Sequence, residues 1–225
     1  MRVALTIDIE ERSRPAGTGN AERQLDVLAR EGVRATFFVQ GRWASAWPRL
    51  ARRLHDDGHL LGNHTYHHVP LTLMTDDGIR HTVGRAEEVI VPRAGVETLR
   101  PWFRCPYGDG EDDERVLAAL AGLGYRNVPW DVDPKDWRPD RTVEEVVGAV
   151  VDGVQAYGDA AKVLLHSWPD VTVGALPLLV EDLRAAGAEF VTVAELPPWW
   201  AGGRPGDTSG SSPGDDDGDD WRRER

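Results

Sequence analysis

The sequence predicts an α/β fold in which parallel strands alternate with helices. Short apolar runs typical of buried strands alternate with helical patterns, at intervals of about 25 to 30 residues. The length of 225 residues suits one domain, and 40% hydrophobic residues are enough for a sizeable core. Because ligands gather at the carboxyl ends of parallel strands, polar residues that follow several strands are expected to form one site.

Short apolar runs predict about seven strands. The first run, at residues 3–9, is β-branched and apolar until Asp8, as expected of a buried strand. It ends in carboxylates, and a later strand leads directly into a histidine-rich stretch. In chain order, the strands are expected at 3–9, 35–39, 59–61, 102–103, 125–130, 162–165 and 190–193.

Helices are predicted between these strands from apolar patterns and from start and stop signals. Leu25 and Leu28 lie on the apolar side of the first helix, and Gly32 ends it. Thr142 and Glu145 have the spacing of a capping box, which begins a helix. The helices are expected at 21–31, 44–57, 75–90, 112–123, 142–156 and 176–186.

The charge of the chain bears on its partners and on its domain boundaries. A formal net charge of −12 argues against binding to nucleic acid, because nucleic-acid-binding proteins carry clustered Lys and Arg. Much of the negative charge lies in an acidic run close to the C-terminus, where there is almost nothing apolar to bury. We therefore expect a folded domain at residues 1–201 and a disordered acidic tail at 202–225.

Other features of composition bear on the compartment and on the type of ligand. The single cysteine, Cys105, excludes an internal disulfide and a cysteine-based zinc site. No signal peptide is visible and no run of about 18 apolar residues predicts a membrane span, so a cytoplasmic location is expected. The nine Trp residues could line a groove for sugars, but packing in the core or at its rim is the default interpretation of any single one.

The most distinctive stretch is Gly62-Asn63-His64-Thr65-Tyr66-His67-His68, which holds three of the seven histidines. His64 and His68 are spaced i, i+4, so a helical turn would place both imidazoles on one face. Neutral imidazole is a good ligand for zinc and similar divalent ions. For an isolated pair of this kind, a polar turn with solvent-facing histidines is the favoured interpretation, and a metal site needs a third ligand from elsewhere.

Polar residues at other predicted strand ends supply partners for the histidines. These residues are Asp8, Glu10, Arg104, Asp136 and His166. Singly, Arg104 could form a surface ion pair, Asp136 could cap a turn, and His166 could be a satisfied core histidine. Taken together at neighbouring strand ends, they favour a metal-dependent active site over repeated coincidence.

Five stretches, in the same order along the chain, resemble the five motifs of the polysaccharide deacetylase family, the NodB-homology domain of carbohydrate esterase family 4. They are Leu5-Thr6-Ile7-Asp8, the histidine stretch above, Arg104-Cys105-Pro106-Tyr107-Gly108, Asp133-Pro134-Lys135-Asp136-Trp137 and Leu164-Leu165-His166. Residues 35–39 resemble the family's second strand, and the resemblance covers residues 3–196. The second motif is the most specific of the five.

The resemblance implies a distorted (β/α) barrel of the NodB-homology type. It implies a metal-dependent hydrolase that removes N-acetyl groups from an amino sugar or polysaccharide. One divalent ion, zinc or a similar one, would be held by His64, His68 and a carboxylate. Asp8 would act as the general base, and Arg104 would hold the Asp8 carboxylate through a bidentate ion pair.

The resemblance also implies roles around the substrate. The backbone N–H of Tyr107 would donate to the oxyanion of the tetrahedral intermediate. His166, held by Asp136, would protonate the departing amine. Trp137 and Leu164 would pack against the methyl group of the acetyl. The expected partner is thus an N-acetylated sugar or glycan.

The first motif departs from the usual pattern of two adjacent aspartates, because Ile9 follows Asp8. Some members place the metal-binding carboxylate two residues after the base, so Glu10 is assigned to the metal, and Glu11 is a weaker substitute. Two other functions remain open. One is hydrolysis of another amide, such as a formamide or a cyclic ureide, on the same fold. The other is a catalytically inactive sugar-binding homologue.

Overall fold

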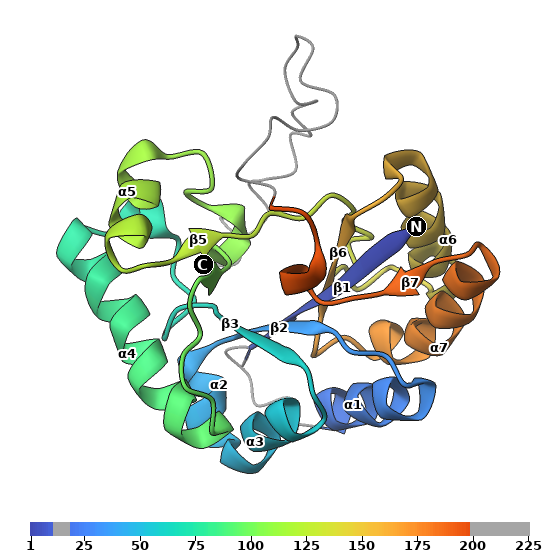
Figure 1. Ribbon diagram of the computed structural model, residues 1–225, viewed down its shortest axis with the longest axis horizontal. Coiled ribbons are helices and arrows are strands. Elements are labelled where there is room, and N and C mark those ends of the chain that lie inside the picture. The colour runs from blue at the N-terminus through green and yellow to red at the C-terminus, as the bar shows by residue number, and fades with distance from the viewer. Residues whose placement is uncertain (11–18, 199–225) are drawn as a thin grey trace, which may run out of the picture.

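The computed structural model describes residues 1–10 and 19–198. A curled sheet lies at the centre of the molecule and helices surround it (Figure 1). The strands pair in the order β5-β4-β3-β2-β1-β6, and β7 pairs with the start of β1. Every pairing is parallel. The prediction of a distorted (β/α) barrel with about seven parallel strands is therefore confirmed.

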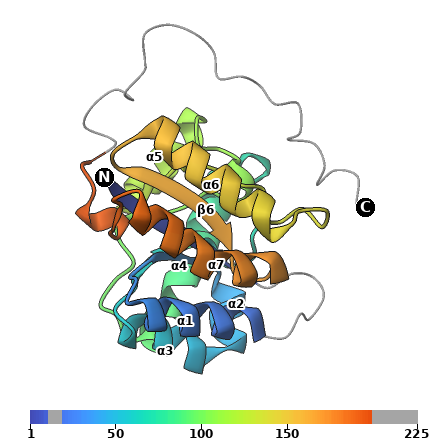
Figure 2. The same ribbon diagram turned by 90° about the vertical axis from the view of Figure 1, so that its right-hand side faces the viewer.

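The elements alternate along the chain as the sequence predicts. The strands are β1 (Arg2–Ile9), β2 (Thr36–Val39), β3 (Leu60–Asn63), β4 (Trp102–Phe103), β5 (Arg126–Asn127), β6 (Ala161–His166) and β7 (Glu189–Phe190). The helices are α1 (Gly19–Glu31), α2 (Gly41–Ala46), α3 (Pro48–Asp56), α4 (Asp76–Ala94), α5 (Glu114–Gly122), α6 (Val143–Tyr157) and α7 (Asp170–Ala185). Three short 3₁₀ segments are η1 (Leu71–Leu73), η2 (Pro106–Gly108) and η3 (Val193–Glu195). Helices α6, α7 and α1 lie side by side along one flank (Figure 2).

Alternation of side chains along β1 determines which residues reach the inside of the barrel. Odd-numbered residues such as Val3 and Ile7 pack in the larger apolar cluster, between the sheet and the helices. Ala4 belongs instead to a smaller cluster on the opposite face of the sheet. Because successive side chains of a strand point to opposite faces, Thr6 and Asp8 share the inner face with Ala4.

The register of the sheet aligns the polar strand ends along one edge. Asp8 pairs with His166 across the β1–β6 ladder. Beyond β3, the His64 N–H donates to the Val39 carbonyl at 3.0 Å, and the Arg104 N–H donates to the Asn63 carbonyl at 3.0 Å. Hydrogen bonding between neighbouring strands therefore continues just beyond the strand ends, at the level where the predicted site residues occur.

The predicted helix at 44–57 is divided into α2 and α3 at Trp47. Trp47 has φ −127° and ψ 59°, and Pro48 occupies the first turn of α3. A residue before proline avoids the helical region, and proline is well suited to start a new helix. The prediction of one continuous helix was wrong at this position because it ignored Pro48.

Proline has less effect in two other helices. The predicted helix at 75–90 extends to Ala94 with Pro92 in its last turn, and a left-handed Gly95 ends it. The predicted helix at 176–186 begins earlier, at Asp170, and contains Pro177. The predicted strand at 125–130 is reduced to β5, Arg126–Asn127. Pro129 cannot donate a ladder hydrogen bond, so the longer strand was wrong.

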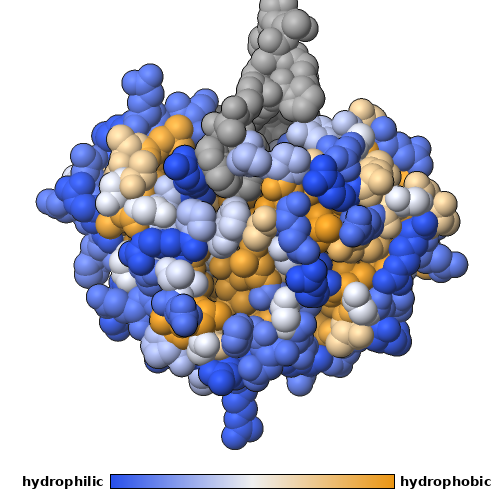
Figure 3. All heavy atoms as spheres, viewed as in Figure 1, coloured by the Kyte–Doolittle hydropathy of each residue, from blue (hydrophilic) through white to orange (hydrophobic). Residues whose placement is uncertain are grey.

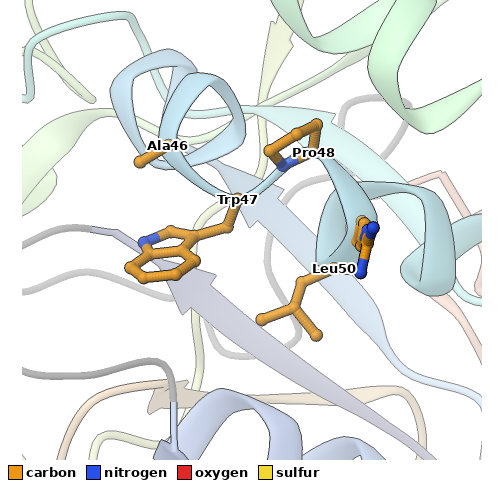
Figure 4. Close-up of a pocket in the computed structure, with 5 residues that line it drawn as sticks. Ala46, Trp47, Pro48 and Leu50 are labelled. Carbon is orange, nitrogen blue, oxygen red and sulfur yellow. The ribbon is translucent and has the colours of Figure 1, made fainter.

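The surface is mainly hydrophilic at its margin, with apolar side chains nearer the centre of the face shown (Figure 3). A shallow groove of about 220 Å³ at the corner between α2 and α3 is lined by Ala46, Trp47, Pro48, Arg49 and Leu50 (Figure 4). It contains none of the predicted site residues. Among the described residues, no helix is both long and apolar enough to cross a membrane. Glu11 and the predicted tail at 202–225 lie outside the described residues.

Candidate active site and metal centre

Glu10, His64 and His68 come together beyond the ends of β1 and β3. One potential ligand atom from each residue lies within 4.8 Å of the others. Oε2 of Glu10 lies 2.8 Å from Nε2 of His68, and the two imidazole centroids are 4.7 Å apart. Two imidazoles and one carboxylate are a suitable ligand set for a divalent transition metal.

The hydrogen bonding of His64 fits a metal ligand. Its Nδ1 lies 2.9 Å from the backbone carbonyl of Arg104, which can only accept, so Nδ1 carries the proton. The Nε2 atom of His64 is buried and has no hydrogen-bond partner. Burial lowers the pKa of His64 to about 4, so the ring is neutral near pH 7. Nε2 of His64 is thus a buried, neutral nitrogen without a partner, grouped with Glu10 and His68, and a bound metal ion would supply the missing partner.

The segment that carries the two histidines is not the helical turn that the i, i+4 spacing predicted. Thr65 and His68 have positive φ values of 62° and 58°, and no helix is assigned to the segment. The side chain of Asn63 accepts from the Thr65 N–H at 2.9 Å, and the Thr65 hydroxyl accepts from the His68 N–H at 3.0 Å. These local bonds stabilise an irregular loop that still brings both imidazoles together.

Glu10 is ionised in this environment. Burial alone would favour the neutral acid, but the neighbouring His68, followed by His166 and His64, holds the pKa of Glu10 well below its usual range. Its second oxygen, Oε1, accepts a hydrogen bond of 3.1 Å from the indole N–H of Trp168. Both oxygens of the carboxylate therefore have defined neighbours.

Asp8 is held at the inner face of β1 by a buried guanidinium. Nη1 of Arg104 donates to Oδ1 of Asp8 at 2.8 Å, and Nη2 donates instead to the hydroxyl of Thr6 at 2.8 Å. The Nε–H of Arg104 donates to the Val128 carbonyl at 3.2 Å. The expected bidentate ion pair is therefore wrong, because Thr6 takes the second arm of the fork. Oδ2 of Asp8 lies 3.5 Å from Nε2 of His64, beside the metal-ligand set.

His166 and Asp136 form a tightly connected pair at the end of β6. Nδ1 of His166 lies 2.7 Å from Oδ1 of Asp136, and the His166 backbone N–H donates to Oδ2 at 2.8 Å. The hydroxyl of Thr172 also donates to Oδ2, at 2.6 Å. Burial lowers the pKa of His166, but the Asp136 carboxylate outweighs it and raises the pKa to about 9. The imidazole is therefore a protonated acid near neutral pH.

The remaining predicted residues lie around this centre. Tyr107, in η2, has a left-handed backbone with φ 59°, and its exposed ring lies 4.4 Å from the ring of His68. Leu164 shares the inner face of β6 with His166, two residues later, and is buried. Trp137 is half-buried and directly follows Asp136.

Sequence reasoning missed three residues that contact this centre: Thr6, Thr172 and Trp168. Thr6 lies two residues before Asp8, so period-2 alternation along the strand could have placed it beside the base. Thr172 lies in the first turn of α7, whose start was predicted too late. Trp168 follows His166 by two residues, but a single Trp is interpreted by default as a packing residue. Nothing in the sequence marked its indole N–H as a donor to Glu10.

Comparison with known proteins agrees with this geometry. The family model described as polysaccharide deacetylase matches residues 1–128. A peptidoglycan-N-acetylglucosamine deacetylase from Bacillus cereus is 32% identical over 179 residues, which cover 76% of this chain and 61% of the relative. A chitooligosaccharide deacetylase from Sinorhizobium fredii is 36% identical over 180 residues, which cover 72% of this chain and 79% of the relative. The chain thus spans about three fifths of the Bacillus cereus protein.

Solved structures show the same fold. A family 4 carbohydrate esterase from Streptomyces lividans, in complex with acetate, has a TM-score of 0.72 and 29% identity, over 83% of this chain and 90% of that one. A pseudoenzyme of the same family from Bacillus anthracis has a TM-score of 0.76 and 26% identity, over 87% of this chain and 64% of that one. From the family model, these relatives and the shared fold, we conclude that the chain belongs to the polysaccharide deacetylase family, carbohydrate esterase family 4.

Proposed function

We propose that this domain is a metal-dependent hydrolase that removes N-acetyl groups from amino sugars in a glycan. The carrying observation is the juxtaposition of a possible metal-ligand set with a base and an acid. Oδ2 of Asp8 lies 3.5 Å from Nε2 of His64, and Asp8 pairs with His166 across the sheet. Amide hydrolysis by a metal-activated water requires these three functions in one place.

Glu10, His64 and His68 would hold the ion, and zinc is the proposed native metal. Two imidazole nitrogens and one carboxylate oxygen leave further coordination positions open, as catalytic zinc sites do. When bound, the ion would polarise the amide carbonyl and make a water molecule nucleophilic near neutral pH. The buried carbonyl of Arg104 fixes the tautomer of His64 for this purpose.

Asp8 acts as the general base that accepts the proton of the attacking water. Its Oδ1 is committed to Arg104 at 2.8 Å, while its Oδ2 faces the metal-ligand set. The guanidinium is fully buried and has three acceptors, Asp8, Thr6 and the Val128 carbonyl, so its orientation is fixed. A base held in this way meets the water without rearrangement of the site.

His166 acts as the general acid. The amine of an amide must leave protonated, because an amide anion is a very poor leaving group. Asp136 fixes the tautomer of His166 through Nδ1, so the opposite nitrogen, Nε2, is the one that delivers the proton. The Tyr107 N–H would stabilise the oxyanion that forms at the attacked carbonyl. Trp137 and Leu164 would contact the acetyl methyl.

The proposed substrate class is an N-acetylated amino sugar within an oligosaccharide or polysaccharide. Deacetylases of peptidoglycan and of chitooligosaccharides among the relatives support this class. The test is release of acetate from oligomers of N-acetylglucosamine by the purified protein, with and without a chelator. We expect turnover that the chelator abolishes and that added Zn²⁺ restores.

Asp8→Asn serves as the negative control in this assay, because it keeps the size of the side chain and removes the base. We expect it to lower kcat strongly. Hydrolysis of a formamide or a cyclic ureide in place of the acetylated sugar would replace the proposed substrate class. Binding of the oligomer without turnover, in protein that holds a full equivalent of metal, would instead favour the inactive homologue.

A further inference from the structure

The two oxygens of the Glu10 carboxylate have different neighbours. Oε2 lies 2.8 Å from Nε2 of His68, on the side of the metal-ligand set. Oε1 accepts a hydrogen bond of 3.1 Å from the indole N–H of Trp168. The side chain of Glu10 is only 11% exposed, so water competes little for either oxygen. The carboxylate thus has one oxygen directed toward the histidines and one held by the indole.

Trp168 is itself attached to rigid elements. It follows β6, whose last residue, His166, pairs with Asp8 in β1. The Trp168 carbonyl accepts from Nδ2 of Asn20 at 2.8 Å, and the His166 carbonyl accepts from Nε2 of Gln24 at 3.1 Å. Both amide donors belong to α1, so this helix holds the backbone that carries the indole. The backbone from which the indole extends is therefore fixed at two points.

A glutamate ligand needs such a partner more than an aspartate does. Glutamate has one more rotatable bond, so its carboxylate can turn away from a metal or present both oxygens to it. The indole nitrogen is a donor only, so it binds one carboxylate oxygen and leaves the other free for the metal. Partners that orient a ligand in this way typically contribute about 10- to 100-fold to metal affinity.

We propose that Trp168 is a positioning residue whose indole N–H fixes Glu10 so that Oε2 serves as the metal ligand. This inference rests on the proposed metal site and adds a determinant of its affinity. It links the unusual glutamate of the first motif to the end of β6. The indole also lies beside the ring of His166, with centroids 5.8 Å apart. This packing contact does not require the N–H, so it can be separated from the hydrogen bond to Glu10.

The test separates the hydrogen bond from the packing and from the ligand. Wild type, Trp168→Phe, Glu10→Ala and the double variant are stripped of metal and titrated with Zn²⁺ against a chromophoric chelator, and with Co²⁺ by absorption. Trp168→Phe keeps an aromatic ring and deletes the donor. We expect it to raise the Kd for Zn²⁺ about 10-fold and to alter the Co²⁺ spectrum. In the Glu10→Ala background, the same substitution should have no further effect.

Trp102→Phe is the matched control, because Trp102 lies in β4, which β2 and β3 separate from β1. Its Kd should equal that of the wild type. A wild-type Kd in Trp168→Phe, or an equal increase with and without Glu10, would overturn the positioning role and leave the metal site standing. An unchanged Kd in Glu10→Ala would remove Glu10 from the ligand set, and with it both this inference and the proposed site.

Discussion

The buried carboxylate of Asp136 binds His166 at two points, its ring Nδ1 and its backbone N–H. The first contact fixes the tautomer and orientation of the imidazole, and the second fixes the end of β6. The side chain of Asp136 is fully buried, so its charge acts on His166 with little screening by water. The Asp136 carboxylate thus both positions the imidazole of His166 and favours its protonated form.

This pair predicts the alkaline side of the pH–rate profile. The pKa of His166 is raised to about 9, so the general acid is protonated below that pH and loses its proton above it. Activity should therefore fall as the pH rises through about 9. Asp136→Asn removes the charge that raises the pKa, so the fall should move to lower pH. The measurement is kcat as a function of pH for both proteins.

His166→Ala should lower kcat by about 10²- to 10⁴-fold, as expected for a lost general acid. Its metal content should stay at the wild-type level, since His166 is outside the ligand set. Near-normal kcat at full metal occupancy in this variant would be incompatible with the donor role. An alkaline limb that stays in place in Asp136→Asn would show that another group titrates there.

Thr172→Val should destabilise the protein by about 1–3 kcal/mol, because it removes a donor from the buried Asp136 carboxylate. The effect on kcat should be smaller than that of Asp136→Asn, since both contacts to His166 remain. Urea unfolding gives the free energy of unfolding. Thr98→Val is the control, because the Thr98 hydroxyl donates to the Glu87 side chain at 3.2 Å and accepts from the Arg100 N–H at 3.1 Å at an exposed position, where water can replace both bonds. Equal stability of the two variants would argue against a structural role for Thr172.

Arg104→Lys should reduce both stability and turnover although it keeps the charge. A lysine ammonium cannot reproduce the planar fork that joins Asp8 and Thr6. We expect a loss of about 2–4 kcal/mol in the free energy of unfolding and about 10²-fold in kcat. Arg30→Lys, at an exposed pair with Glu31, should change neither. Wild-type kcat in Arg104→Lys would mean that Asp8 does not depend on this contact.

His59 should make the fold sensitive to acid. The His59 ring is buried, its Nδ1 accepts from the Ala35 N–H at 3.1 Å, and burial lowers its pKa from 6.5 to about 4. Between these values the unfolded chain binds a proton that the folded state does not, so the stabilisation present above pH 6.5 is lost as the pH falls. The expected loss from His59 between pH 7 and pH 5 is about 2 kcal/mol.

His59→Asn provides the comparison, because an amide oxygen can still accept from Ala35 but does not titrate. Urea unfolding of both proteins at pH 7 and pH 5 isolates the contribution of His59 from that of other histidines, such as His64. The wild type should lose more stability on acidification than the variant. Identical losses would show that His59 is not the titrating group.

The sequence carries much of the site because strand ends are local features. Asp8, Arg104 and His166 each directly follow or end an apolar run, and parallel strands bring such positions to one edge. The conformation of the histidine loop could not be read in this way. Thr65 and His68 adopt positive φ, which non-glycine residues do only where the surroundings stabilise it, here through Asn63 and Thr65.

Contacts between distant residues were also beyond the sequence. The Glu10–Trp168 hydrogen bond joins residues 158 positions apart and depends on the β1–β6 register. Alternation along β1 could place Thr6 beside Asp8, but nothing in the sequence shows that the second arm of Arg104 donates to the Thr6 hydroxyl. Ion-pair geometry of this kind is set by packing, which a motif does not encode.

The central claim is that the two histidines of the second motif hold a catalytic metal. The most direct measurement is the metal content and the acetate release of the same preparations of wild type, His64→Ala and His67→Ala. His67 is the matched control, because it is exposed and packs edge-to-face against the ring of Tyr66, outside the ligand set. We predict one divalent ion and full turnover in wild type and His67→Ala, and loss of both in His64→Ala. Full metal content and turnover in His64→Ala would contradict the account.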